Sequence, residues 1–360
     1  MSDPAGPPAS RKVAPLVEKR LEDLLRSETK RWAQVDEELA VPLSDLASSV
    51  LSGGKRLRAA FCYWAFVGAG GDAEDPRVVD AGAALEMLHS AALLHDDVID
   101  GSDRRRGVPT VHVEHAQRHR RMGWSGDAAR FGAGVAILTG DLALVYGDRL
   151  LSGAPREAAD VYDEMRLEVN FGQYLDVLGA ADKSGLAGEK GIERARRIIR
   201  YKTAKYTVER PLHLGAAMAA PSAFAELKGP LSRFGLPLGE AFQLRDDLLG
   251  VFGDPARTGK PVGEDLREGK PTMLASLAAA RAAGQDAELF ASRFGAPDLA
   301  PGEIRQLQDV IDSSGARAAV EGEVARLARE ASSALSQLPF EGEALASLGE
   351  LAEFVAGRDQ

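Results

Sequence analysis

Residues 77–100 constrain the fold more than any other part of the chain. This stretch, RVVDAGAALEMLHSAALLHDDVID, carries apolar side chains nearly all the way round a helix and leaves no wide polar face. A helix of that kind is stable when other helices surround it. The stretch therefore predicts a long helix in the middle of a bundle, with three aspartates at its end.

The rest of the chain favours the same class of fold. Ala, Leu, Glu, Arg and Val dominate at helical spacing, and few segments alternate with a period of two. We predict an all-α fold, a single domain of about a dozen helices around a central apolar cavity. The domain is expected over 15–360, after a loose Pro/Gly-rich tail over 1–14. The predicted helices cover, in order, 16–40, 42–52, 57–68, 77–100, 133–151, 155–178, 191–209, 212–220, 230–252, 271–283 and a broken 302–355.

Composition excludes several classes of protein. The formal net charge is −10, so binding of nucleic acid or anionic lipid requires a segregated basic face, and the sequence shows none on the scale that a polynucleotide needs. Cys62 is the single cysteine, which excludes an internal disulfide and any multi-cysteine metal site and favours a reducing cytoplasm. No uninterrupted apolar stretch approaches the roughly 20 residues of a membrane span, so we expect a soluble protein.

The acidic end of the 77–100 helix is a candidate metal site. Asp96 and Asp100 are four residues apart and share one helical face, whereas Asp97 points elsewhere. Carboxylates at a helix C-terminus add to the negative end of the macrodipole and need a compensating cation. A sparse carboxylate pair completed by water and phosphate is typical of Mg²⁺. The alternative is a solvated acidic helix end.

Basic residues follow directly. Arg104, Arg105, Arg106 and Gly107 form a short turn-like segment, and guanidinium groups match phosphate oxygens. The alternative here is internal pairing of aspartate with arginine. A second acidic pair, Asp246-Asp247, lies in another largely apolar helical stretch, and two such helices can hold ions between them in a bundle core.

Three further motifs carry basic residues. The stretch Gly53–Arg58 places Lys55 and Arg58 one turn apart after a glycine break, where helix N–H groups also favour an anion. Lys202-Thr203 lies within a predicted helix, a place where such residues more often face solvent. A Gly-rich loop at 254–272 carries Lys260 and Lys270 and suits a phosphate lid, although such loops are usually plain surface. We treat His89 as a possible phosphate donor and His95 as structural.

Taken together, these motifs resemble those of the trans-isoprenyl diphosphate synthases, also called the polyprenyl synthetase family. The resemblance extends over about residues 40–280 and rests on GGKRLR at 53–58, LLHDDVIDGSDRRRG at 93–107, GQYLD at 172–176, YKTAKYT at 201–207 and FQLRDDLLGVFGDPARTGKPVGEDLREGKPT at 242–272. It implies a Mg²⁺-dependent condensation of isopentenyl diphosphate with an allylic diphosphate. It also implies a homodimer.

The resemblance assigns roles residue by residue. The metal residues are Asp96, Asp97, Asp100, Asp246 and Asp247, with Asp96, Asp100 and Asp246 holding three Mg²⁺ ions. Lys55, Arg58, His89 and Arg106 hold isopentenyl diphosphate. The allylic diphosphate is held by Arg105, Lys202, Gln243, Lys260 and Lys270, with Thr203 and Gln173 near the developing cation. Among these, Arg105, Lys202, Thr203 and Gln243 are the expected catalytic residues.

Two features depart from the family pattern. Gly250 stands where the second motif usually has a third aspartate, and the segment 115–132 is longer than usual and is interpreted as a surface excursion. Ala91 and Leu88 lie one and two turns below Asp96 and are expected to set product length; the small Ala91 favours a C20 product, geranylgeranyl diphosphate, over C15. Farnesyl (C15) or longer products, a class I terpene cyclase and a non-catalytic partner subunit remain alternatives.

Overall fold

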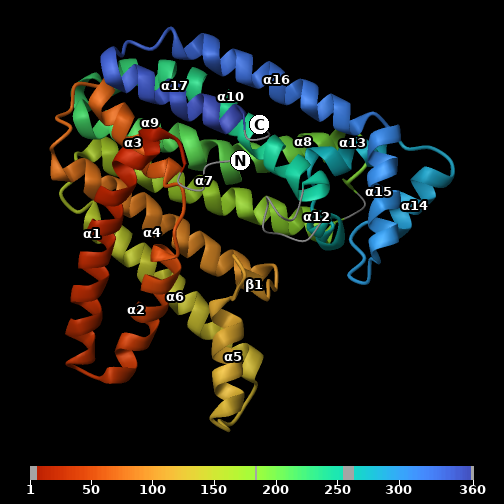
Figure 1. The fold of residues 1–360 in the computed structure, drawn as a ribbon, viewed down its shortest axis with the longest axis horizontal. Coiled ribbons are helices and arrows are strands. Elements are labelled where there is room, and N and C mark those ends of the chain that lie inside the picture. Colours follow the sequence, from red (N-terminus) through yellow and green to blue (C-terminus); the bar gives the residue numbers. More distant parts are fainter. Residues whose placement is uncertain (1–5, 183–184, 254–262, 358–360) are drawn as a thin grey trace. The chain divides into compact units, whose positions relative to one another are not determined.

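The structure is a computed structural model and describes residues 6–182, 185–253 and 263–357. These residues form helices almost throughout, which confirms the predicted all-α class (Figure 1). The first half of the chain contains α1 (Pro8–Ala33), the 3-10 helix η1 (Glu37–Ala40), α2 (Val41–Leu51), α3 (Leu57–Gly68), α4 (Pro76–Ile99), β1 (Arg104–Arg105), β2 (Val108–Pro109), α5 (Val111–Arg121), α6 (Ala128–Leu150) and α7 (Arg156–Ala181).

The second half continues with helices of varied length. They are α8 (Glu189–Ile198), the π-helix η3 (Ile199–Glu209), α9 (Arg210–Ala219), the 3-10 helix η4 (Pro221–Ala223), α10 (Phe224–Phe252), α12 (Glu264–Glu268), α13 (Met273–Arg281), α14 (Gln285–Arg293), α15 (Pro301–Ser313), α16 (Ala316–Leu335) and α17 (Gly342–Ala356). The predicted helix over 302–355 is therefore broken into three.

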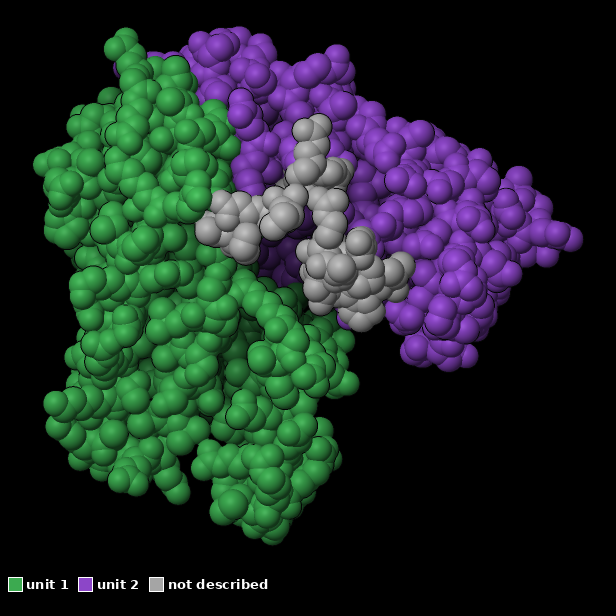
Figure 2. Space-filling view, in the orientation of Figure 1, with its two compact units in different colours: residues 1–161, 211–224, 340–351 green, residues 162–210, 225–339, 352–360 purple. Residues whose placement is uncertain are grey.

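The chain divides into two compact units, coloured separately in Figure 2. Unit 1 comprises residues 1–161, 211–224 and 340–351, and unit 2 comprises residues 162–210, 225–339 and 352–360. Each unit draws on separated stretches of the chain. The single domain expected over 15–360 stays a prediction.

The helix predicted over 77–100 is α4, and it is a core helix of unit 1. Asp75 caps its N-terminus by accepting a hydrogen bond from the backbone N–H of Arg77, and Pro76 occupies the first helical position. Thirteen of its residues, from Val78 to Asp97, are buried on several sides of the helix. It packs against α1, α2, α3 and α6, so the absence of a polar face is explained by surrounding helices.

Two sequence-based expectations about local structure were wrong. The loose tail expected over 1–14 is shorter, because α1 begins at Pro8 and buries Ala9, Ser10 and Val13. The segment 115–132 is not a plain surface excursion, since most of α5 lies in it and α5 packs along α6. Two of its histidines, His115 and His119, are buried. Because the buried face of α5 carries polar side chains, a search for periodic apolar residues does not detect it.

Unit 2 has its own hydrophobic core. Residues of α10, α13, α15 and α16 supply most of it, among them Leu244, Leu274, Leu307 and Val320. α13 packs against α8, α15 and α16. This core supports the C-terminal part of α10, where the second acidic pair lies.

One helix among the described residues is long and apolar enough to cross a membrane. This helix is α6, judged by length and composition alone, and 28% of its most apolar window is buried. The sequence analysis expected no such stretch. The core helix of a soluble protein passes the same test.

Candidate active site

The last turn of α4 holds the first acidic motif. Asp96 and Asp97 lie in this turn, and Asp100 is the C-cap residue, whose N–H donates to the carbonyl of Asp96 at 2.8 Å. The side chain of Asp97 is 7% exposed and that of Asp96 is 22% exposed. Ala91 and Leu88 are buried about one and two turns earlier. The helix therefore carries its carboxylates at one end and an apolar surface below them.

Asp97 makes a much closer contact with Arg105 than Asp96 does. The Arg105 guanidinium donates to Oδ1 of Asp97, at 2.6 Å from Nη2 and 2.8 Å from Nε, whereas Oδ2 of Asp96 lies 4.0 Å from Nη2. Burial alone would lower the pKa of Arg105, but its hydrogen bond to Asp97 and the charges of Asp97, Asp96 and Asp100 raise it. Internal Asp–Arg pairing, the alternative raised from the sequence, therefore holds for Asp97.

The three consecutive arginines diverge because they sit in a two-stranded hairpin. Arg104 and Arg105 pair with Val108 and Pro109, and the turn residues Arg106 and Gly107 both have positive φ. Arg104 donates back to the carbonyl of Gly107. The guanidinium of Arg106 reaches the end of α2, where it donates to the hydroxyl of Ser52 at 3.0 Å and to the carbonyl of Gly53.

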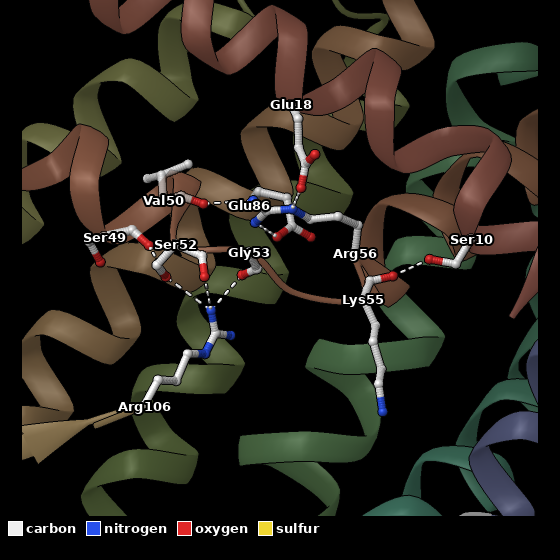
Figure 3. Close-up of polar contacts among 10 residues, drawn as sticks. All are labelled: Ser10, Glu18, Ser49, Val50, Ser52, Gly53, Lys55, Arg56, Glu86 and Arg106. Carbon is white, nitrogen blue, oxygen red and sulfur yellow. Dashed lines mark hydrogen bonds and ion pairs between the residues drawn. The ribbon is translucent and has the colours of Figure 1, made fainter. Parts of the chain in front are cut away.

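A buried ion cluster holds the 53–58 loop (Figure 3). Arg56 adopts a left-handed backbone conformation with φ of 47°, which is unusual for a residue with a side chain. Its guanidinium donates to Glu86 at 2.9 Å, to Glu18 at 3.1 Å and to the carbonyl of Val50 at 2.7 Å. These three contacts fix the backbone between Lys55 and Arg58, and the sequence analysis assigned Arg56 no role.

The N-terminal helix also braces this loop. The hydroxyl of Ser10 in α1 donates to the carbonyl of Lys55, and Glu18 of α1 bonds Arg56. In Figure 3 the side chain of Lys55 points away from the buried ion cluster. In this loop the side chain of Lys55 therefore points away from the buried cluster, whereas that of Arg56 points into it.

His89 lies in a strongly positive environment within unit 1. Burial holds the pKa of His89 well below its usual value. The charges of Arg58, Arg106 and Arg105 lower it further. The imidazole is therefore neutral near pH 7 and carries one N–H. Arg58, Arg105 and Arg106, which the resemblance assigns to diphosphates, thus lie near enough to His89 for their charges to lower its pKa.

Lys202 and Thr203 lie in the π-helix η3 of unit 2. The ammonium of Lys202 donates to Asp176 of α7. The hydroxyl of Thr203 donates to the side-chain carbonyl of Gln243, and the amide nitrogen of Gln243 donates to Asp247 at 2.7 Å. Thr203, Gln243 and Asp247 therefore form a hydrogen-bonded chain, and Lys202 forms a separate pair with Asp176, a residue of the 172–176 motif to which the sequence analysis gave no role.

The wide π-helix fits because its two neighbouring helices have glycine at the points of contact. A Cβ on Gly172 of α7 would lie 2.4 Å from the backbone nitrogen of Lys202. A Cβ on Gly239 of α10 would lie 2.6 Å from the Cα of Ala204. Gln173 follows directly on α7. Close backbone approach thus holds the Lys202-Thr203 segment between α7 and α10.

An ionic network anchors the far end of the π-helix. Arg210 donates twice to Glu168 of α7, at 2.6 and 2.7 Å, and the ammonium of Lys205 bonds the same carboxylate at 2.5 Å. Ser232 of α10 donates to Glu209 at 2.6 Å. Because the Glu168, Arg210 and Glu209 side chains are all buried, breaking any of these contacts leaves a polar group without compensation.

The second acidic motif contains an unexpected neighbour. A Cβ on Gly250 would lie 2.0 Å from Oδ2 of Asp265, so the carboxylate of Asp265 occupies the space next to Gly250. Burial raises the pKa of Asp247 to about 8, and the charges of Asp265 and Asp246 contribute. A divalent cation beside these groups would favour their charged forms. The sequence analysis assigned Asp265 no role, although this residue lies within the motif quoted over 242–272.

Of the two lysines in the predicted phosphate lid, the described residues include only Lys270. Lys270 lies after α12 and forms ion pairs with Glu268 at 2.8 Å and with Asp265 at 3.8 Å. Lys260 lies outside the described residues. The predicted phosphate lid is therefore described for Lys270 alone.

The donor sets fit a metal that is completed by substrate. Among the residues that the structure describes, no group of three or more His, Cys, Asp or Glu side chains could hold an ion without help. Mg²⁺ is usually bound through one or two carboxylates plus water and phosphate oxygens. Asp96 with Asp100 in unit 1, and Asp246 in unit 2, match that pattern of sparse hard oxygen ligands.

Comparisons with known proteins identify the family to which the chain is similar. The family model for polyprenyl synthetase matches residues 41–311. The geranylgeranyl diphosphate synthase of Mycobacterium tuberculosis H37Rv is 38% identical over 259 residues, which is 71% of this chain and 66% of that enzyme. The geranylfarnesyl diphosphate synthase of Aeropyrum pernix is 29% identical over 81% of this chain and 85% of that enzyme.

A solved structure agrees with these relatives. The geranylgeranyl pyrophosphate synthase of Corynebacterium glutamicum, in complex with isoprenyl diphosphate and magnesium, superposes with a TM-score of 0.88 at 38% identity. The match covers 96% of this chain and 99% of that one. The family resemblance predicted from the sequence motifs is confirmed. The chain belongs to the polyprenyl synthetase family of trans-isoprenyl diphosphate synthases and is a prenyltransferase.

Proposed function

We propose that the protein condenses isopentenyl diphosphate with an allylic diphosphate, head to tail, and that its main product is geranylgeranyl diphosphate. The observation that carries the proposal is the cluster of Arg58, Arg105 and Arg106 around a neutral His89, beside the acidic end of α4. Basic groups of this density suit a diphosphate, and the adjoining carboxylates suit the metal bound to it.

The metal would be held by Asp96 and Asp100 from one motif and Asp246 from the other, with three ions in total. Bound there, Mg²⁺ would neutralise charge on the departing diphosphate. Asp265 takes the place of the missing third aspartate, because its carboxylate lies over Gly250. Gly250 therefore does not argue for a non-catalytic subunit.

The chain's own groups would act as follows. Lys202, Lys270 and Arg105 hold the allylic diphosphate, so that its C–O bond ionises in a preorganised positive site. The Thr203 hydroxyl donates a hydrogen bond to the side-chain carbonyl of Gln243, which leaves the hydroxyl lone pairs available to the developing allylic cation. The isopentenyl double bond attacks that cation, and the released diphosphate removes the proton. No side-chain nucleophile takes part.

Incubation of the purified protein with both diphosphates tests the proposal. With Mg²⁺ present, we expect elongated prenyl diphosphates and release of pyrophosphate, and EDTA should abolish both. A terpene cyclase would consume the allylic diphosphate alone and release a hydrocarbon. A non-catalytic partner subunit would consume neither substrate.

Product length depends on the surface of α4 below Asp96. Ala91 and Leu88 are 1% and 3% exposed, and both enzymes at 38% identity are geranylgeranyl synthases. Ala91→Phe should shift the main product from C20 to C15, because the ring fills space beyond the first layer. Chromatography of the dephosphorylated products reads this out, with Ala92→Phe, on a different side of α4, as the matched control. An unchanged product length would show that other residues limit the chain.

We further propose that the protein acts as a homodimer. α6 exposes a stripe of Ile137, Leu138 and Val145, which are 44%, 62% and 54% exposed, along one side of the helix. Exposed apolar side chains of this kind are typical of an interface, and a second copy can cover them symmetrically. Leu138→Arg should convert the dimer to a monomer in light scattering, and a wild-type monomer would contradict the assignment. The cytoplasmic location expected from the single cysteine stays a prediction.

A further inference from the structure

The proposed reaction uses no residue of the segment between β2 and α6. We call residues 111–131 the α5 arm; it comprises α5, the turn after it and the first turn of α6. Figure 1 shows α5 at one end of unit 1, with the turn after it pointing away from the other helices of that unit. An arm that contributes nothing to the reaction needs another explanation.

The α5 arm is held in one conformation by buried and aromatic contacts. His115 bonds Asp45 of α2 at 2.7 Å. The ring of Phe131 packs against His119 and Trp124, each with centroids 5.3 Å away. The indole ring is therefore fixed on the arm. These contacts present the turn after α5 as a preformed surface.

The charge at the tip of the arm is net positive, because three arginines accompany one aspartate, Asp127, whose carboxylate accepts a hydrogen bond from the backbone N–H of Arg130 at 2.7 Å. Arg120, Arg121 and Arg130 are exposed and have no ion pair among the described residues. Three exposed arginines elsewhere in the chain are paired, namely Arg26 with Glu22, Arg77 with Asp75, and Arg326 with Glu323 and Glu330. In a chain with a formal net charge of −10, the tip is a small segregated basic face.

Apolar side chains lie beside these arginines. Met122 is 61% exposed and Trp124 is 42% exposed. The guanidinium of Arg118 lies over the indole ring, 5.7 Å from its centroid. An exposed tryptophan and methionine among arginines is the composition of an interfacial anchor, where the ring lies at headgroup depth and the guanidinium groups meet phosphates.

We propose that the tip of the α5 arm docks on the surface of an anionic lipid bilayer. Met122 and Trp124 enter the headgroup region, and Arg120, Arg121 and Arg130 contact lipid phosphates. The benefit of membrane docking rests on the proposed function, because a C20 diphosphate product is an amphiphile that enters bilayers; the docking itself does not depend on that function. A polynucleotide is the less suitable partner, since methionine offers it no stacking face and the remaining surface repels it.

Vesicle co-sedimentation of the full-length protein tests this proposal. We expect binding to phosphatidylglycerol:phosphatidylcholine (1:1) vesicles, at least tenfold weaker binding to phosphatidylcholine alone, and weakening by 0.5 M salt. The triple variant Arg120→Gln/Arg121→Gln/Arg130→Gln should bind about 100-fold more weakly, because each basic residue near such a surface contributes about fivefold. Trp124→Ala should also bind more weakly.

A matched control removes the same number of charges elsewhere. The triple variant Arg26→Gln/Arg77→Gln/Arg326→Gln should keep wild-type vesicle binding. Both triple variants should keep wild-type turnover of soluble substrates, which separates this proposal from the proposed function. Equal binding of the two triple variants, equal binding to neutral vesicles, or tighter binding of the arm to duplex DNA than to vesicles would overturn the proposal.

Discussion

Replacing Glu86 by glutamine perturbs the ion cluster that holds the 53–58 loop. The guanidinium of Arg56 is shared by Glu86 and Glu18, and the Arg56 and Glu86 side chains are each 4% exposed, whereas that of Glu18 is 41% exposed. Glu86→Gln preserves the shape of the side chain but removes its charge. The buried guanidinium then keeps one, partly solvated, carboxylate.

The expected magnitude follows from this difference in burial. Removing one partner of a fully buried pair destabilises by about 3–5 kcal/mol, and the remaining Glu18 reduces this to about 3 kcal/mol. An exposed ion pair contributes about 0–1 kcal/mol, so Glu18→Gln should destabilise by less than about 1 kcal/mol. The two variants make the same chemical change against the same arginine.

Urea denaturation followed by circular dichroism measures both variants. Steady-state kinetics then tests the link to function. Because Arg56 fixes the backbone between Lys55 and Arg58, we expect Glu86→Gln to raise the KM for isopentenyl diphosphate while leaving the KM for the allylic substrate unchanged. A loss of stability no larger than that of Glu18→Gln would refute the reasoning about burial, and equal changes in both KM values would refute the positioning role.

Three further predictions concern single residues. Because the folded protein holds the pKa of His89 below its unfolded value of 6.5, the free energy of unfolding should fall as the pH falls below about 6.5. His89→Asn should reduce that pH dependence by up to about 1.4 kcal/mol per pH unit, measured by urea titrations of ligand-free protein at several pH values. The same pH dependence in the variant and the wild type would contradict this prediction. Gly172→Ala should lower kcat at least tenfold, because its Cβ would lie 2.4 Å from the backbone nitrogen of Lys202, whereas Gly322→Ala, which meets no atom within 4 Å, should leave kcat unchanged. Gly250→Asp should weaken Mg²⁺ activation rather than restore a motif, because the α12 carboxylate already occupies that space; tighter activation in a Mg²⁺ titration would show the opposite.

The sequence was most informative where structure is local. The apolar circumference of 77–100 predicted a surrounded helix, and α4 is one. Spacing of three and four residues places side chains on one face of a helix whatever its neighbours are. The family motifs identified the chemistry for the same reason, since the residue types that bind metal and diphosphate stand close together in the chain.

The partners of those residues were decided by tertiary structure. Asp97 bonds Arg105, Arg56 turns inward to Glu86, and the carboxylate of Asp265 lies over Gly250. The last two contacts join residues 30 and 15 positions apart, and their geometry depends on how helices pack and where loops end.

The π-helix shows the same limit. The sequence over residues 199–209 predicts an ordinary α-helix. The spacing of apolar residues in so short a stretch does not distinguish a π-helix from an α-helix. Gly172 and Gly239, distant in sequence, allow the wider backbone to fit between two helices. The chain by itself determined which helices form and what chemistry they carry; the close packing of those helices decided which carboxylate, guanidinium and backbone atoms meet, because that packing depends on contacts between residues far apart in the sequence.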